Sequence, residues 1–253
     1  MRIRKKSNLT QQILELYSKK LTNKEIADIL QVSTKKVNSD LNRNNLLSNK
    51  YSQIEETNEL KQFILGSILG DGYLVKIDNI YKESRISFGH GLKQKDYCKY
   101  KHSLLDKYNL AGKFRYYSNY DYRFKNNLNE NYTFKSLTNP LFTKYRNLFY
   151  NKEGKKYINR EVIKDLNEFG LAIWFMDDGS KSLSGYNIYT CSFSIKDVLF
   201  LKQFIEEKFG LYCTYCKSTN SIYIKKKSVE KFTNLIKPYT ITSMLYKLHK
   251  GPV

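Results

Sequence analysis

Two acidic residues stand at the ends of two apolar segments of the same form. The segments are ILGSILGDG over residues 64–72 and LAIWFMDDG over residues 171–179, and each ends in Asp followed by Gly. If both segments are helices whose last turns meet, Asp71 and Asp178 bring two carboxylates together, and these repel each other unless a cation lies between them. Hard divalent ions such as Mg²⁺ prefer oxygen ligands of this kind. The pattern therefore favours metal-assisted hydrolysis.

Two such helices can lie side by side only if small residues let their backbones approach. Gly66, Gly70 and Ala172 are small at suitable positions, whereas residues 173–175 (Ile, Trp, Phe) are bulky. We therefore expect a close but uneven helix pair at a pseudo-twofold axis.

The elements around these segments follow the same order twice, which predicts an internal duplication. Asp71 and Asp178 are 178 − 71 = 107 residues apart. In the first half the patterns predict a helix from about residue 58, strands over 73–77 and 81–90, a helix over 93–108, further strands, and a helix over 141–149. In the second half they predict a helix over 166–176, strands over 180–183 and 186–193, a helix over 195–209, strands over 211–217 and 221–226, and a helix over 229–236.

The two nine-residue segments resemble the LAGLIDADG motif, with its final Asp-Gly in place both times. The second half, from IWFMDDGSK to LIKPYTITSMLYKL, is similar to the monomeric omega-intron endonucleases of that family, whereas the first half matches chiefly at its motif. The resemblance implies an α+β fold in which two pseudo-symmetric αββαββα repeats form a saddle of antiparallel sheets. It also implies an endonuclease that cuts double-stranded DNA with two or three Mg²⁺ ions.

The same resemblance implies a set of site residues. Asp71 and Asp178 would be the catalytic metal ligands, together with the residues before them, Gly70 and Asp177, of which Asp177 would bind only through its backbone carbonyl. Members of this kind carry a basic residue near each metal centre. The matching positions are Lys247 in MLYKL and Lys156, or its neighbour Lys155, in GKKYIN.

The charge of the chain points to a polyanionic partner. Lys and Arg total 44 against 24 Asp and Glu, a net charge of +20, so a positive field surrounds the folded protein. No apolar run approaches the roughly 18 to 20 residues that span a bilayer, so nucleic acid is favoured over membrane. The lack of a secretory signal and the few cysteines predict an intracellular protein, with a bacterial or phage cytoplasm and an organelle matrix both left open.

Residues 1–45 are expected to form a separate all-α module. Three short helical patterns follow one another, and Thr22 with Glu25 forms a capping box at the second. The third pattern begins at Ser33 and presents Lys35 and Lys36, as the recognition helix of a helix-turn-helix does. An ordinary three-helix packing unit is the alternative. A polar linker over 46–57 would precede repeats over 58–155 and 156–253.

Alternating polar and apolar residues predict which side chains face DNA across the saddle. The candidates are basic, amide or aromatic residues on one face of the expected strands: Arg85, Arg115, Arg123, Asn187, Tyr189 and Lys225. Some of these should contact bases and others phosphates.

Two other functions fit the same scaffold. A maturase that binds intron RNA would also need a basic, aromatic surface. A non-catalytic DNA-binding regulator would keep the body and lose the chemistry, but both Asp71 and Asp178 are present. Because one chain holds both motifs, we expect a monomer with an asymmetric target.

Overall fold

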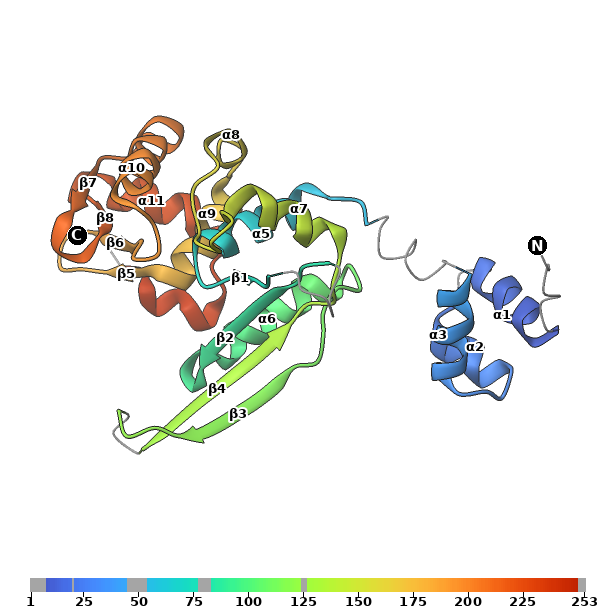
Figure 1. Cartoon of the computed structure of the whole chain (residues 1–253). Helices are drawn as coiled ribbons and strands as arrows, with labels where there is room; N and C mark the ends of the chain where they lie inside the picture. Colours follow the sequence, from blue (N-terminus) through green and yellow to red (C-terminus); the bar gives the residue numbers. More distant parts are fainter. Residues whose placement is uncertain (1–7, 20, 45–53, 77–82, 124–126, 250–253) are drawn as a thin grey trace. The chain divides into compact units, whose positions relative to one another are not determined.

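The computed structural model describes residues 8–19, 21–44, 54–76, 83–123 and 127–249 (Figure 1). The chain divides into two compact units, residues 1–55 and 56–253. Each unit has a hydrophobic core of its own.

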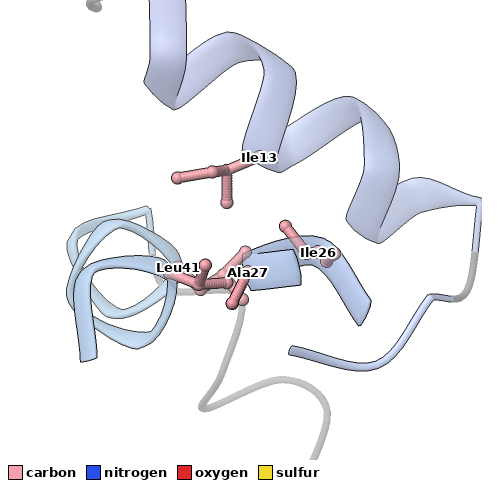
Figure 2. Packing of buried hydrophobic residues seen from close by; sticks show 5 residues of the cluster. Ile13, Ile26, Ala27 and Leu41 are labelled. Atoms are coloured by element: carbon pink, nitrogen blue, oxygen red, sulfur yellow. The ribbon is translucent and has the colours of Figure 1, made fainter. Parts of the chain in front are cut away.

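The N-terminal unit contains three helices, α1 (Asn8–Ser18), α2 (Asn23–Ile29) and α3 (Thr34–Arg43). Their apolar faces meet in a small core, shown in Figure 2, of five buried residues: Ile13, Ile26, Ala27, Val37 and Leu41. Helix α2 begins at the capping box predicted from the sequence, since Thr22 and Glu25 bond each other's backbone N–H groups. Ser33 caps α3 by accepting from the backbone N–H of Lys36.

The larger unit contains the predicted αββαββα order twice. The first copy consists of α5 (Asn58–Leu69), β1 (Tyr73–Leu74), β2 (Ile86–Gly91), α6 (Lys95–Asp106), β3 (Arg115–Tyr120), β4 (Leu128–Lys135) and α7 (Pro140–Phe149). The second consists of α9 (Glu168–Asp178), β5 (Gly179–Lys181), β6 (Tyr186–Tyr189), α10 (Ile195–Phe209), β7 (Cys213–Cys216), β8 (Ser221–Ile224) and α11 (Val229–Ile236). A short helix, α8 (Arg160–Ile163), joins them, and single-turn or longer 3₁₀ helices span residues 92–94, 217–219, 226–228, 237–239 and 242–247.

Each copy forms one four-stranded antiparallel sheet, which confirms the predicted α+β fold. The strand orders are β1-β2-β4-β3 and β5-β6-β8-β7, so the two sheets have the same topology. Their first strand pairs also match in register, because Tyr73 pairs with Ser87 and Ser180 pairs with Asn187. Tyr73 and Ser180 each lie two residues after an aspartate of the motif. The two copies therefore correspond position by position in the strand pairs that follow the two aspartates.

Helices α5 and α9 pack against each other along buried faces (Figure 1). A Cβ atom at Gly66 would overlap the carbonyl oxygen of Gly170, so both glycines let the helix backbones approach. The buried side chain of Gln62 links the two helices further, because it donates to the carbonyl of Asp165 and accepts from the backbone N–H of Asn167. The expected close pair is present, and Gly170 is a contact that the sequence reading did not name.

Several strands in both sheets are shorter than predicted, and in the second sheet β6 ends at Tyr189 within the predicted 186–193. Strand β1 contains only residues 73–74 of the predicted 73–77, and β2 begins at Ile86 inside the predicted 81–90. Residues 77–82 lie outside the described part of the chain. Within the described residues, no helix is long and apolar enough to cross a membrane.

Candidate active site

Asp71 and Asp178 lie where the two central helices end. Helix α9 ends at Asp178, and Asp71 follows α5 after Gly70. Burial, the charge of Asp71 and then the charge of Asp177 raise the pKa of Asp178 to about 7. Burial and then the charge of Asp177 also raise the pKa of Asp71. Asp71 therefore lies close enough to Asp178 to disfavour the ionised form of that carboxyl, and a cation bound between the two would relieve this repulsion.

A lysine lies at the C-terminal end of each central helix. The Lys156 ammonium donates to the carbonyls of Ile68 (2.9 Å) and Gly70 (3.1 Å) at the end of α5. The Lys247 ammonium donates to the carbonyls of Met176 (2.6 Å) and Asp177 (2.9 Å) at the end of α9. Both ammonium groups thus satisfy carbonyls that a helix leaves unpaired and place positive charge beside the carboxylates.

Burial changes the protonation of both lysines. It lowers the pKa of Lys156 to about 8, and it lowers the pKa of Lys247 as well. The Lys156 amine therefore releases and takes up a proton nearer to neutral pH than an exposed lysine does. The neighbouring Lys155 has an exposed side chain, and its backbone N–H donates to the side chain of Asn151.

Gly70 and Asp177 precede the two aspartates and fit against each other. A Cβ atom at Gly70 would lie 2.5 Å from both the Cβ and the Oδ2 atom of Asp177, so only glycine leaves room for this carboxylate. Asp177 Oδ2 accepts the backbone N–H of Asp71 at 3.1 Å. Asp177 Oδ1 lies 2.5 Å from the ammonium of Lys101, and both of these side chains are fully buried.

His90 reaches the same place from the end of β2. Its Nδ1 atom lies 3.7 Å from Asp71 Oδ2, and burial lowers its pKa to about 4, so the ring is neutral at neutral pH. Asp71, His90 and Asp177 offer ligand atoms that all lie within 4.8 Å of one another. The oxygen-rich set formed by Asp71, Asp178 and the nearby carbonyls has the donor chemistry of a Mg²⁺ site.

Comparisons with known proteins agree with this geometry. Residues 61–232 match the model of the LAGLIDADG DNA endonuclease family, and they include both aspartates. The chain belongs to this family. It is 44% identical over 124 residues to the intron-encoded endonuclease ai4 of Dictyostelium discoideum, a match that covers 47% of this chain and 77% of the relative.

Two further similarities extend over most of the LAGLIDADG unit. The chain is 31% identical over 207 residues to the cytochrome b mRNA maturase bI2 of Saccharomyces cerevisiae, covering 73% of this chain but only 46% of that relative. The homing endonuclease I-WcaI, solved bound to its DNA recognition sequence, superposes with a TM-score of 0.72 at 26% identity, covering 81% of this chain and 93% of that one.

The first sheet of this LAGLIDADG protein carries a basic groove that begins at Asp71. The groove has a volume of about 960 Å³ and runs over the face of β2, β4 and β3 that is opposite α6. Its basic lining residues are Arg85, Lys113, Arg115 and Lys135. The two predicted arginines Arg85 and Arg115 thus line the same groove as Asp71.

Other predicted contact residues have different surroundings. Arg123 lies beyond β3, where Asp121 holds its guanidinium at 2.6 Å and raises its pKa. In the second sheet, Asn187 and Tyr189 share the face of β6 opposite the buried Tyr186 and Ile188, and Lys225 follows β8 with an exposed side chain.

In the N-terminal unit, the two predicted lysines of α3 differ in their partners. Lys35 is exposed, whereas Lys36 pairs with the buried Asp40 at 3.0 Å. Asp40 also accepts from the hydroxyl of Thr10. Lys36 therefore contributes to the internal packing of this unit as well as to its surface charge.

Sequence reasoning missed His90, Lys101 and the side-chain role of Asp177. A signal for Lys101 was available, because it falls on the apolar stripe of α6 at helical spacing from Tyr97, Leu104 and Leu105. A lysine at such a position must find a buried partner. For His90 the alternation with Ile86 and Phe88 indicated an inward side chain, but nothing indicated which residue it would approach.

Proposed function

We propose that this protein is a site-specific homing endonuclease that hydrolyses both strands of DNA at a long, asymmetric target with Mg²⁺. One observation carries the proposal: Asp71 and Asp178 meet at the ends of α5 and α9, and the part-buried Lys156 and the buried Lys247 each bind one of these helix ends. A cation bound between the two carboxylates would remove the repulsion that helps to raise the pKa of Asp178.

In this proposal the two aspartates hold the metal ions, with the carbonyls of Gly70 and Asp177 as further oxygen ligands. Each of those two carbonyls already accepts from a lysine, and a carbonyl oxygen has a second lone pair for an ion. When bound, the ions activate water and stabilise charge on the phosphate and the leaving oxygen.

Lys156 and Lys247 orient the ends of the helices and hold positive charge beside the scissile phosphates. Lys156, with its pKa near 8, can also exchange a proton with the water close to the metal ion. Both roles depend on the position and charge of the ammonium groups, and neither lysine acts as a nucleophile.

DNA would lie along the sheet faces that carry the proposed contacts. I-WcaI was solved bound to its DNA recognition sequence, which supports the same use of the similar fold here. The groove with Arg85 and Arg115 would follow one half of the site, and Asn187, Tyr189 and Lys225 the other. Because the two faces differ in sequence, the two half-sites differ, and one chain acts as a monomer.

The N-terminal unit would add DNA contacts through Lys35 and Lys36 on α3, as a helix-turn-helix does. Deletion of residues 1–50 should weaken binding to the target and leave the position of the cut unchanged. A shifted cut would show that this unit takes part in defining the cleavage site.

The test of the proposed function is cleavage of a plasmid library of candidate insertion sites by the purified protein. We expect double-strand breaks at one long site in Mg²⁺ and none in Ca²⁺. Tight binding to DNA without breaks in any divalent ion would contradict the proposal.

Assistance of intron splicing is a second candidate, supported by the similarity to the bI2 maturase over 73% of this chain. It predicts that the protein binds the folded intron RNA that contains its own reading frame more tightly than a scrambled RNA of equal length. Equal affinity for the two RNAs at 0.2 M salt, on the order of physiological strength, would contradict it.

A further inference from the structure

Lys101 is a fully buried lysine beneath the first catalytic aspartate. Its ammonium lies 2.5 Å from Asp177 Oδ1 and 4.7 Å from the ring centres of both Phe88 and Tyr97. A buried ammonium is costly unless a charged partner and polarisable groups surround it. The fold therefore maintains a fixed positive charge at this position.

The groups around Lys101 are arranged like the ligands of a cation. Asp71, His90 and Asp177 offer ligand atoms within 4.8 Å of one another. His90 is only 3% exposed, and among the described residues its Nε2 atom has no hydrogen-bond partner. The other ring nitrogen, Nδ1, lies 3.7 Å from Asp71 Oδ2, and two carboxylates with an imidazole nitrogen would suit a divalent transition metal.

Among the residues that the structure describes, the second half of the site has no such cluster. By strand register, the residue that corresponds to His90 is Thr190, because each lies three positions after the partner of the matching residue in β1 or β5. Thr190 donates through its hydroxyl to the carbonyl of Asn220. In the second copy, Lys202 of α10 pairs with Glu206.

We propose that Lys101 is the resident cation of the Asp71–His90–Asp177 cluster. Its ammonium occupies the charge position that a metal ion would otherwise take, and it keeps the side chain of Asp177 away from the catalytic ions. Through Asp177 Oδ2, which accepts the backbone N–H of Asp71, it also fixes the backbone that carries the first catalytic carboxylate. Lys101 is thus a positioning residue for one of the two cleavage centres.

The consequence for cleavage rests on the proposed function. If Lys101 positions only the cleavage centre that contains Asp71, then its loss changes the cutting of one DNA strand more than the other. The consequence for metal binding does not depend on DNA. Lys101→Met retains the length of the side chain and removes the charge, which leaves Asp71, His90 and Asp177 free to bind an added ion.

The experiment compares the full chain with Lys101→Met, with Lys101→Met/Asp177→Asn, and with Lys202→Met as the matched control. Bound Mn²⁺ is counted by electron paramagnetic resonance, and melting temperatures are measured with and without Mn²⁺. We expect Lys101→Met to bind one more Mn²⁺ than the wild-type protein and to gain more thermal stability from it. The double variant and Lys202→Met should both bind the wild-type number.

An unchanged number of bound Mn²⁺ ions in Lys101→Met, with no added stabilisation by Mn²⁺, would overturn the proposal. If Lys101→Met folds only when Mn²⁺ is present, that dependence supports the proposal, provided that the double variant folds without the ion. Strand-resolved cleavage is the second readout, and we expect the ratio of the two nicking rates to change at least about threefold in Lys101→Met. If the wild-type protein cuts no DNA, that result counts against the proposed endonuclease function. The number of bound Mn²⁺ ions then still tests the role of Lys101.

Discussion

The carboxylate of Asp177 accepts the backbone N–H of Asp71 at 3.1 Å, so a residue of the second motif holds the backbone of the aspartate of the first. This contact exists only because the first motif has glycine, Gly70, where the second has Asp177. The two motifs are therefore complementary at this position and not equivalent.

Substitution of Gly70 by alanine tests this complementarity. The new methyl group would lie 2.5 Å from Asp177, so we expect a loss of about 1 to 3 kcal/mol in the free energy of unfolding and weaker cleavage. Gly91→Ala is the control, because a Cβ atom there has no described heavy atom within 4 Å. Urea denaturation of both variants measures the difference, and equal stabilities would argue against the close fit.

Lys156 and Lys155 provide a matched pair of neighbouring lysines. Lys156 binds the end of α5, whereas the Lys155 side chain is exposed. We expect Lys156→Met to slow cleavage by about 10²-fold or more, as loss of a group that acts at the reacting centre does, with little change in DNA affinity. Lys155→Met should cut at nearly the wild-type rate. Similar cleavage rates for the two variants would show that Lys156 does not act in the active site.

The raised pKa of Asp178 predicts how stability depends on pH when metal is absent. Its value of about 7 exceeds the value near 4 expected in the unfolded chain, so the folded state binds more protons between these two pH values. The contribution of Asp178 to the free energy of unfolding must then fall as the pH rises from about 4 to 7.

Asp178→Asn removes that contribution. We expect this variant to be more stable than the wild-type protein at pH 8, by on the order of 2 kcal/mol, and similar to it near pH 4. The measurement is urea denaturation in EDTA at both pH values. A stability difference that does not change with pH would show that Asp178 ionises normally.

Arg115 and Arg123 differ in their surroundings although both were predicted to contact DNA. Arg115 lines the groove beside Asp71, whereas Arg123 is held by Asp121. We expect Arg115→Ala to weaken target binding by roughly 1 to 3 kcal/mol and to reduce the slope of log affinity against log salt by about one. Arg123→Ala should have a smaller effect, and titrations at several salt concentrations distinguish the two. A larger effect at Arg123 would place the DNA path beyond β3.

The sequence predicted those parts of the structure that depend on local pattern. Helices α10 and α11 have the predicted bounds, and the capping box of α2 and the order of helices and strands along both copies are as expected. These features follow from hydrophobic spacing and caps, which operate over a few residues.

Contacts between residues far apart in the sequence could not be predicted in the same way. The approach of Gly66 to Gly170, the pairing of Lys101 with Asp177 and the position of His90 beside Asp71 each join residues 19 or more positions apart. Charge and burial indicate that such a residue needs a partner, but only the packing of α5, α6 and α9 determines which partner it finds.

Asp71 and Asp178 are proposed to act together on DNA through metal ions. The most direct test is strand-resolved cleavage of the identified target by Asp71→Asn and Asp178→Asn in Mg²⁺, with DNA affinity measured in parallel in Ca²⁺. We predict that each substitution abolishes double-strand cleavage and leaves affinity within about tenfold of the wild-type value. Full double-strand cleavage by either variant would contradict the claim.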